Sequence, residues 1–231
     1  MRQVLRQEKK YLLNNIDYYM ITGTLEKVLI PDPHNKGQGY KVRSLYFDTL
    51  DDKDYAEKIM GIELRKKIRL RVYNPTDNFA YLEIKQKEGM YQKKRSLKLS
   101  KEDSLELISL NYEVLLKYDN PFAYECYSLL KENCYQPKTV VEYNRKAFIA
   151  KENNIRITLD SNICATESNY NIFDENLLLY PVFTKENVVL EVKYNGFILS
   201  YIKNLLDNCE KSELSVSKYC LARQVSLNYV F

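Results

Sequence analysis

Eight segments of the chain alternate apolar and polar residues, which is the pattern of β-strands that bury one face. Several are joined by short stretches such as 74–78 and 88–90, whose Pro, Gly, Asn and Asp residues favour tight turns, so we expect antiparallel hairpins. Five further segments have the spacing of helices. The predicted strands are residues 3–12, 40–48, 62–73, 79–87, 91–99, 139–150, 155–163 and 188–194, and the predicted helices are 16–30, 101–108, 122–132, 197–207 and 215–226.

The polar positions of these strands are rich in cations. Because successive side chains on a strand point to opposite faces, Lys67, Arg69 and Arg71 lie together, opposite an apolar face. Residues 62–95 contain ten basic and four acidic side chains, whereas the whole chain carries a formal charge of only +4. The positive charge is therefore concentrated on consecutive strands. The same alternation groups Glu83 with Lys85 and Lys87, Lys93 with Arg95, and Glu8 with Lys10.

A charged face on any single strand is most simply explained by a sheet with one face in water. That explanation is weaker for several hairpin-linked strands together, because a solvated face usually mixes both signs of charge and neighbouring like charges repel. An anion would make the arrangement favourable, and closing the sheet would direct the cations at one enclosed ligand. We therefore predict an α+β fold in which a closed antiparallel eight-stranded β-barrel forms a tunnel with peripheral helices.

Composition narrows the class of protein. The 231 residues are 45% hydrophobic and 13% aromatic, which excludes a disordered chain, and no repeat or linker divides them, so one domain over residues 1–231 is expected. No apolar run reaches the length of a membrane helix and residues 1–10 are charged, so we expect a cytoplasmic protein without direct membrane insertion. His34, the single histidine, lies in a turn-rich loop, which argues against a histidine metal site or a catalytic triad. The five cysteines lack C-x-x-C spacing and are interpreted as buried or incidental thiols: Cys126, Cys134, Cys164, Cys209 and Cys220.

A chain of phosphates fits the cationic strands best. Arg and Lys make charge-assisted hydrogen bonds of about 1.5–3 kcal/mol each to phosphate oxygens. Carboxylates on the same faces, Glu8 and Glu191, would repel a bare anion but can hold Mg²⁺ or Mn²⁺ through oxygen ligands. The residues therefore indicate a complex of polyphosphate and a divalent metal as the ligand.

Nine short motifs follow one another along nearly the whole chain. They are Glu8-Lys9-Lys10-Tyr11, Arg43-Ser44-Leu45-Tyr46-Phe47-Asp48, Ile68-Arg69-Leu70-Arg71, Leu82-Glu83-Ile84-Lys85, Lys93-Lys94-Arg95, Glu142-Tyr143-Asn144-Arg145, Ile155-Arg156-Ile157-Thr158-Leu159-Asp160, Leu190-Glu191-Val192-Lys193-Tyr194 and Val216-Ser217-Lys218-Tyr219. Each motif is weak alone. In this order they resemble the VTC domain, the catalytic module of polyphosphate polymerases in the triphosphate tunnel metalloenzyme (CYTH-like) superfamily.

The resemblance implies roles for individual residues. Glu191 and Glu8 would bind the metal, Mn²⁺ or Mg²⁺. The turn at 88–90 leaves open whether Lys93 or Lys94 points to the phosphates. The implied catalytic residues are Arg69, Arg71, Arg145 and Lys218, and the implied substrate-binding residues are Lys10, Lys85, Lys87, Lys93, Arg95, Tyr143, Arg156, Lys193 and Ser217.

The implied activity is that of an ATP-dependent polyphosphate polymerase, which transfers the γ-phosphate of a nucleoside triphosphate to the end of a growing polyphosphate. Phosphoryl transfer needs positioning and charge neutralisation rather than a protein nucleophile. Many superfamily members carry Glu-x-Glu-x-Lys on the first strand, whereas this chain has Arg6-Gln7-Glu8-Lys9-Lys10, and the missing carboxylate argues against the hydrolytic branches. ATP and polyphosphate are the expected partners. The sequence leaves a membrane-protein partner open, although fungal relatives are tethered to membranes.

Two other functions remain open from the sequence, and a third is disfavoured. The same fold could hydrolyse inorganic or nucleoside triphosphates, and sequence separates that activity poorly from polymerisation. A non-catalytic module that binds polyphosphate or inositol phosphates would need only the cations. Nucleic-acid binding is not expected, because packing within the fold explains the tyrosines better than stacking on bases: Tyr46, Tyr73, Tyr81, Tyr91 and Tyr143.

Overall fold

The computed structural model describes residues 6–35, 37, 39–89, 91–182, 187–207, 212–213 and 217–227. Within it the chain forms two compact units, each assembled from three separate stretches of sequence. Unit 1 consists of Met1–Lys41, Tyr143–Ile163 and Pro181–Ser217, and unit 2 of Val42–Glu142, Cys164–Tyr180 and Lys218–Phe231.

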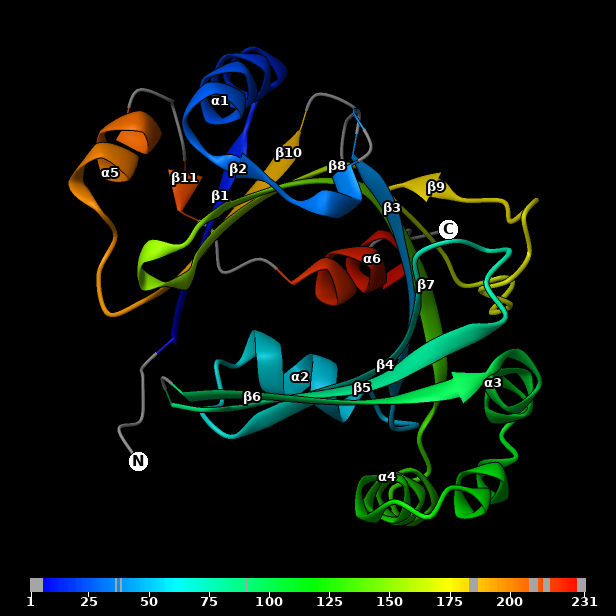
Figure 1. Ribbon diagram of the computed structural model, residues 1–231. Coiled ribbons are helices and arrows are strands. Elements are labelled where there is room, and N and C mark those ends of the chain that lie inside the picture. Colours follow the sequence, from blue (N-terminus) through cyan, green and yellow to red (C-terminus); the bar gives the residue numbers. More distant parts are fainter. Residues whose placement is uncertain are drawn as a thin grey trace. The chain divides into compact units, whose positions relative to one another are not determined.

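Unit 1 is a sheet with two helices on one face (Figure 1). Its strand order is β11-β1-β10-β8-β7, with β2 paired to β7. Helices α1 and α5 lie beside each other, and their apolar side chains join those of β1, β8 and β10 in one core. Its elements are β1 (Arg6–Leu13), α1 (Asn15–Val28), β2 (Ile30–Pro31), the 3-10 helices η1 (Pro33–Asn35) and η3 (Glu152–Asn154), β10 (Val188–Asn195), α5 (Ser200–Asp207) and β11 (Ser212–Glu213), together with parts of β7 (Gln136–Ala150) and β8 (Ile155–Thr166).

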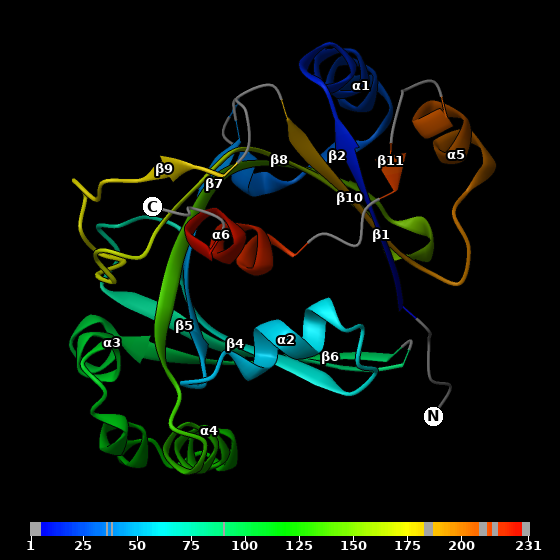
Figure 2. The same ribbon diagram turned by 180° about the vertical axis from the view of Figure 1, so that it is seen from behind.

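Unit 2 is a second antiparallel arrangement, in the order β7-β3-β4-β5-β6. Helices α3 and α4, with η2, pack their apolar side chains against one face of these strands, and α2 lies on the other face (Figure 2). Its elements are β3 (Tyr40–Asp48), α2 (Lys53–Ile59), β4 (Arg65–Val72), β5 (Phe79–Glu88), β6 (Tyr91–Ser100), α3 (Lys101–Ile108), η2 (Tyr112–Lys117), α4 (Pro121–Glu132) and α6 (Lys218–Leu227), and the short β9 (Tyr180–Pro181) pairs with β8.

All eight strands and all five helices predicted from the alternation are present, with ends within a few residues of the expected ones. Residues 3–5 of the first predicted strand and 215–216 of the last predicted helix lie outside the described residues. Side chains cap several helices: Ser100 accepts the backbone N–H of Asp103 at 3.0 Å, Asn14 that of Asp17 at 2.8 Å and Asn120 that of Phe122 at 2.8 Å.

The predicted closed eight-stranded barrel is not supported. In the described residues the sheet has 11 strands, three of them only two residues long, and the strand order is open, with β11 and β6 at its two ends. Alternation of side chains determines which face of a strand is buried, but it carries no information on whether the two edge strands pair.

The inward faces of the strands are apolar in both units. In unit 2, Leu45 and Phe47 of β3 pack with Ile68 and Leu70 of β4, all at most 1% exposed. Unit 1 has an equivalent layer, in which Leu190 and Val192 of β10 contact the helices. Since each strand buries one face, its alternate positions carry polar side chains on the opposite face.

Helix α2 was not predicted, because its N-terminus is capped from a different element. The carboxylate of Asp48, at the end of β3, accepts the backbone N–H groups of Asp54 and Tyr55 at 2.8 and 2.9 Å. It also accepts the hydroxyl of Tyr219, on α6, at 2.6 Å. Asp52, directly before the helix, has a left-handed backbone (φ 55°) and makes no side-chain cap. Nearer the helix, the hydroxyl of Thr49 also accepts the backbone N–H of Lys53, the first helical residue, at 3.0 Å.

Asp54, in the first turn of α2, is a second buried carboxylate. It is 1% exposed and accepts the hydroxyl of Tyr135 at 3.0 Å. Desolvation by burial, followed by the charge of Asp48, raises the pKa of Asp54 to about 7, against the attraction of Lys66. The folded protein therefore favours the protonated form of Asp54 at mildly acidic pH.

We predict that Asp54→Asn is more stable than the wild type above pH 7 and equal to it below about pH 4. Because the folded-state pKa exceeds the ordinary value of 3.8, the wild type loses stability as pH rises between these limits, by at most about 4 kcal/mol. Urea titrations from pH 4 to 8 measure the difference, with the exposed Glu132→Gln as control. A difference that does not vary with pH would contradict this account.

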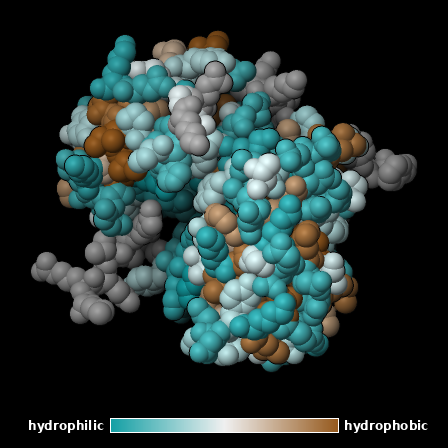
Figure 3. All heavy atoms as spheres, turned by 45° about the vertical axis from the view of Figure 1, so that its right-hand side comes forward, coloured by the Kyte–Doolittle hydropathy of each residue, from teal (hydrophilic) through white to brown (hydrophobic). Residues whose placement is uncertain are grey.

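No helix in the described part of the chain has the length and apolar character needed to cross a membrane. The face in Figure 3 is mostly hydrophilic, with scattered apolar side chains. Cys126 and Cys220 are buried, Cys164 is partly exposed and Cys134 is exposed, and none of these four is in a disulfide, while Cys209 lies outside the described residues.

Candidate functional site

The polar side chains of β4, β5 and β6 form a charged face on the side of the sheet opposite the unit 2 core. Its rows follow from the strand register: Lys67 is opposite Lys85, and Lys85 is opposite Lys94. In the neighbouring row Arg69 is opposite Glu83, and Arg71 lies two residues further along β4. We call Lys67, Arg69, Arg71, Glu83, Lys85 and Lys94 the unit 2 charged face.

Glu83 is the centre of this face and is only 2% exposed. One carboxylate oxygen accepts Nε of Arg69 at 2.7 Å and lies 3.7 Å from NH1 of Arg71, and the other is paired with Lys94. Burial alone would raise the pKa of Glu83, but Arg69, Arg71 and Lys94 outweigh it and lower this pKa to about 2. Three cations thus converge on one ionised carboxylate.

Tyr46 connects this cluster to α6. Its hydroxyl accepts a hydrogen bond from NH1 of Arg69 at 3.2 Å, and its ring stacks on Tyr219 with centroids 5.2 Å apart. Burial would raise the pKa of Tyr46, but Arg69, Arg71 and Lys218 together lower it. Lys218, at the start of α6, therefore acts electrostatically on the same group as the two arginines. Ser44 accepts a hydrogen bond from Nε of Arg71 at 3.1 Å.

The register of β6 corrects two sequence-based expectations. Lys93 is opposite Gln86 and Arg95 is opposite Ile84, so both lie on the face away from Lys85. Arg95 is paired there with Glu125 of α4 and stacks over the ring of Phe122. Lys94, and not Lys93, belongs to the charged face. The turn at Gly89 determines this register, because Glu88 pairs with Tyr91. Lys87 lies opposite Arg65, on the same face as Lys85 and two residues further along β5, as expected.

Unit 1 has its own charged face, on β1, β10 and β8. The register places Glu8 opposite Lys193, and Lys10 opposite Glu191. Glu8 pairs with Lys10 at 2.8 Å and Glu191 with Lys193 at 2.6 Å. Burial lowers the pKa of Lys193, although Glu191 and Glu8 oppose the change. Carboxylates and ammonium groups alternate here, in contrast to the excess of cations in unit 2.

Arg145, on β7, is held by a buried partner in unit 1. Its Nε and NH2 donate to the two carboxylate oxygens of Asp160 at 2.6 and 2.7 Å, and its guanidinium lies 5.2 Å from the ring centre of Tyr143. Gly39 has a φ of 101°, and a Cβ there would lie 2.4 Å from the carbonyl oxygen of Arg145. Only glycine therefore allows the chain to pass this close to the backbone of Arg145.

The remaining predicted residues of this set have structural partners. Arg156 donates to Asp32 at 2.9 Å and to the hydroxyl of Tyr40 at 3.0 Å. Ser217, which directly precedes α6, is 7% exposed. Arg43, from one of the sequence motifs, belongs to the core side of β3, where it bonds Glu142 and two backbone carbonyls.

Oxygen donors for a divalent metal meet on the unit 1 charged face. Thr158 is opposite Glu191 on β8, and its buried hydroxyl has no hydrogen-bond partner among the described residues. Among those residues no group of three His, Cys, Asp or Glu forms a complete cage. Mg²⁺ is commonly held by one or two carboxylates plus substrate phosphates, so Glu8, Glu191 and Thr158 fit such an ion in donor type.

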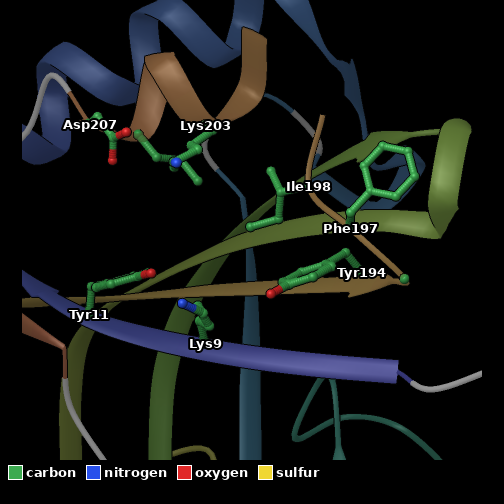
Figure 4. A pocket seen from close by; sticks show the side chains of 9 residues that line it. Lys9, Tyr11, Tyr194, Phe197, Ile198, Lys203 and Asp207 are labelled. Atoms are coloured by element: carbon green, nitrogen blue, oxygen red, sulfur yellow. The ribbon is translucent and has the colours of Figure 1, made fainter. Parts of the chain in front are cut away.

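A pocket of about 380 Å³ lies elsewhere in unit 1 (Figure 4). It lies between α5 and the strands β1 and β10, and its lining includes Lys9, Tyr11 and Tyr194. These side chains alternate with Glu8, Lys10 and Lys193, so the pocket is on the opposite face of the sheet from the predicted site residues. It is therefore separate from the unit 1 charged face.

A model of one protein family covers this arrangement almost completely: the VTC domain model matches residues 5–227. The chain belongs to the VTC domain family. The family predicted from the nine motifs is thereby confirmed. A search of curated protein sequences found no match for this VTC domain.

Solved structures share the fold at low sequence identity. A protein from Hippeastrum, described as a putative adenylyl cyclase with a dominant triphosphatase activity, gives a TM-score of 0.60 at 11% identity over 96% of each chain. A chain of the Schizosaccharomyces pombe Mediator head module gives 0.50 at 10% identity, over 90% of this chain and 99% of that one. One fold thus occurs in proteins of different description, and activity must be argued from residues.

Sequence reasoning gave no role to several residues of these faces. Glu83 is an acidic residue on a strand face that otherwise carries cations, and this exception could have indicated a special role for it. Lys67 could also have been included, since it alternates with Arg69 and Arg71. Asp160 and Thr158 were not identifiable, because their importance comes from the partners that the register gives them.

The register of β6 leads to a prediction for anion binding by the unit 2 charged face. Lys94→Ala should weaken the binding of tripolyphosphate by about tenfold or more, because one charge-assisted bond is worth about 1.5–3 kcal/mol. Lys93→Ala, one position away, should change the dissociation constant by less than about twofold. Isothermal titration of both variants measures the contrast, and the reverse order of effects would show that the register is wrong.

Proposed function

We propose that this VTC domain is a metal-dependent polyphosphate polymerase, which transfers the γ-phosphate of ATP to the end of an inorganic polyphosphate chain. One observation carries the proposal. Five cations project from adjacent positions of three consecutive strands in unit 2, and the acidic side chain among them is Glu83. Like charges opposite each other on a sheet are unfavourable, so such a row is best explained by an extended anionic ligand.

The spacing of the row suits a chain of phosphates better than a single ion. Neighbouring strands lie about 4.8 Å apart, so Lys67, Lys85 and Lys94 form a line of ammonium groups across three strands. Arg69 and Arg71 add planar guanidinium groups beside that line, which match the geometry of phosphate oxygens. A linear polyanion could bridge several of these groups at once.

Transfer breaks the bond between the γ-phosphorus and the oxygen that bridges to the β-phosphate, and forms one to a terminal oxygen of the acceptor chain. ADP leaves, and the chain is one phosphate longer. The transition state is loose, so the protein's contribution is orientation and neutralisation of charge on the phosphate oxygens. Arg69 and Arg71 would supply that neutralisation, with Lys218 near Tyr46 adding a further charge.

The family membership supports roles for unit 1. Glu191 and Glu8 are the proposed holders of Mn²⁺ or Mg²⁺, with Thr158 as an additional oxygen donor. A bound divalent ion would neutralise charge on the phosphate oxygens. Arg145 would add to that neutralisation. The substrate-binding residues proposed here are Lys10, Tyr143, Arg156, Lys193 and Ser217.

Arg71→Ala should abolish the synthesis of phosphate chains, reducing the rate by at least about 100-fold, while the protein stays folded. The residue is 6% exposed and its guanidinium is one of the cations beside Glu83, so its loss removes transition-state neutralisation. Incubation with ATP and Mn²⁺, followed by gel separation of phosphate chains, gives the rate. The control is Lys131→Ala, an exposed cation of α4 paired with Glu113.

The products in that assay separate the proposal from its rivals. Long chains from the wild type and none from Arg71→Ala support the polymerase. Orthophosphate without chains would instead establish hydrolysis of the triphosphate. Unchanged chain synthesis by Arg71→Ala would contradict the assignment of this face to catalysis.

A non-catalytic polyphosphate-binding module is the second candidate. The observation in its favour is that Glu8 and Glu191 are both paired with lysines and complete no metal cage with other described acidic residues. Cations alone would suffice for binding.

Glu191→Gln distinguishes the two candidates. If Glu191 is a metal ligand, this variant should weaken the binding of Mn²⁺ by about tenfold or more and reduce turnover accordingly. Electron paramagnetic resonance of free Mn²⁺ measures the affinity independently of activity. Glu26→Gln, an exposed acid paired with Lys146, is the control. Unchanged affinity and turnover in Glu191→Gln would favour the binding module.

A further inference from the structure

Glu83 does not fit a face whose purpose is only to attract anions. It lies directly opposite Arg69 and within reach of Arg71 and Lys94, so its two carboxylate oxygens engage three of the five cations. A carboxylate presents two negatively charged oxygens about as far apart as two oxygens of a phosphate group, and Arg recognises both. Glu83 thus occupies the kind of position that a phosphate of the substrate would take.

The side chains around Glu83 differ in their exposure to solvent. The side chains of Glu83 and Arg71 are 3% and 7% exposed, whereas Arg69 is 18% exposed and Lys94 is 50% exposed. An incoming phosphate would therefore meet Lys94 and Arg69 first, and would compete with the carboxylate behind them. The pair of Arg145 and Asp160 differs, because it is bidentate and Asp160 is fully buried.

We infer that Glu83 is an internal competitor for the phosphate-binding cations, which limits how tightly the polyphosphate chain is held. The inference rests on the proposed function and adds a residue that determines affinity and release. A chain that is extended stepwise must move along its binding groups after each addition. Binding groups that are partly neutralised by a resident carboxylate can be occupied and left again, whereas a fully uncompensated row would retain a polyanion.

Two properties of Glu83 support this role. Its pKa of about 2 keeps it ionised throughout the neutral range, so the competition is permanent. Its oxygens also occupy Arg69 and Lys94, the two more exposed cations of the cluster, so a phosphate must displace the carboxylate from them. Removal of the carboxylate should therefore increase affinity and slow release together.

The test is the titration of tripolyphosphate, without metal in the presence of EDTA and again with Mg²⁺, into wild type, Glu83→Gln and Arg71→Ala. Glu83→Gln should bind about tenfold more tightly than the wild type, and in the polymerase assay its KM and kcat should both fall. Glu88→Gln, on the same strand but exposed at its end, should bind as the wild type does.

The outcomes separate this inference from the proposed function. If Arg71→Ala weakens binding but Glu83→Gln does not tighten it, the inference is overturned and the proposed function stands. If the wild type does not bind tripolyphosphate, or Arg71→Ala binds it equally well, both fail. Should Glu83→Gln not fold, Glu83→Asp replaces it: this shorter carboxylate weakens the three contacts and should tighten binding by about threefold, and affinity equal to the wild type overturns the inference.

Discussion

Cations that lie side by side on a β-sheet must be compensated, and the structure depends on how this is done. In unit 2 the compensation is one buried carboxylate, Glu83, engaged by Arg69, Arg71 and Lys94. Unit 1 uses one carboxylate for each cation, as in the pairs of Arg145 with Asp160 and Lys193 with Glu191. The two faces therefore differ in the charge they leave available: unit 2 keeps an excess of cations, and unit 1 is close to balance.

This difference modifies the argument made from sequence. The alternation predicts like charges on neighbouring strands, and their mutual repulsion favours an external anion. Part of that anion is supplied by the protein itself, through an acidic residue of the same alternating strand. Lys67, Lys85 and Lys94 still form a row of like charges across three strands, which suits a linear polyanion. The chemistry proposed here therefore rests on this row of like charges rather than on the whole basic segment.

The elements themselves were predictable because strand alternation is a local property. Lys93 and Lys94 show where local information ends: their faces depend on the register set at Gly89, and one residue of slippage exchanges them. Helix α2 depends on the Asp48 carboxylate of a neighbouring strand, and closure of a barrel depends on edges that are distant in sequence. Thr158 and Asp160 likewise could not be identified from sequence, because their roles depend on their neighbours in the fold: Glu191 lies opposite Thr158, and Arg145 donates to Asp160.

The interleaving of the two units along the sequence has a consequence for how the molecule can be divided. Each unit draws on three stretches, and β7 and β8 each contribute residues to both. No single cut in the polypeptide yields a fragment with one intact hydrophobic core and nothing of the other. Truncation is therefore unsuited to isolating either charged face. Duplication or exchange of one unit by recombination would also be difficult, because no continuous segment of the chain encodes it. Variation within this architecture should proceed by side-chain substitution and by changes in loops.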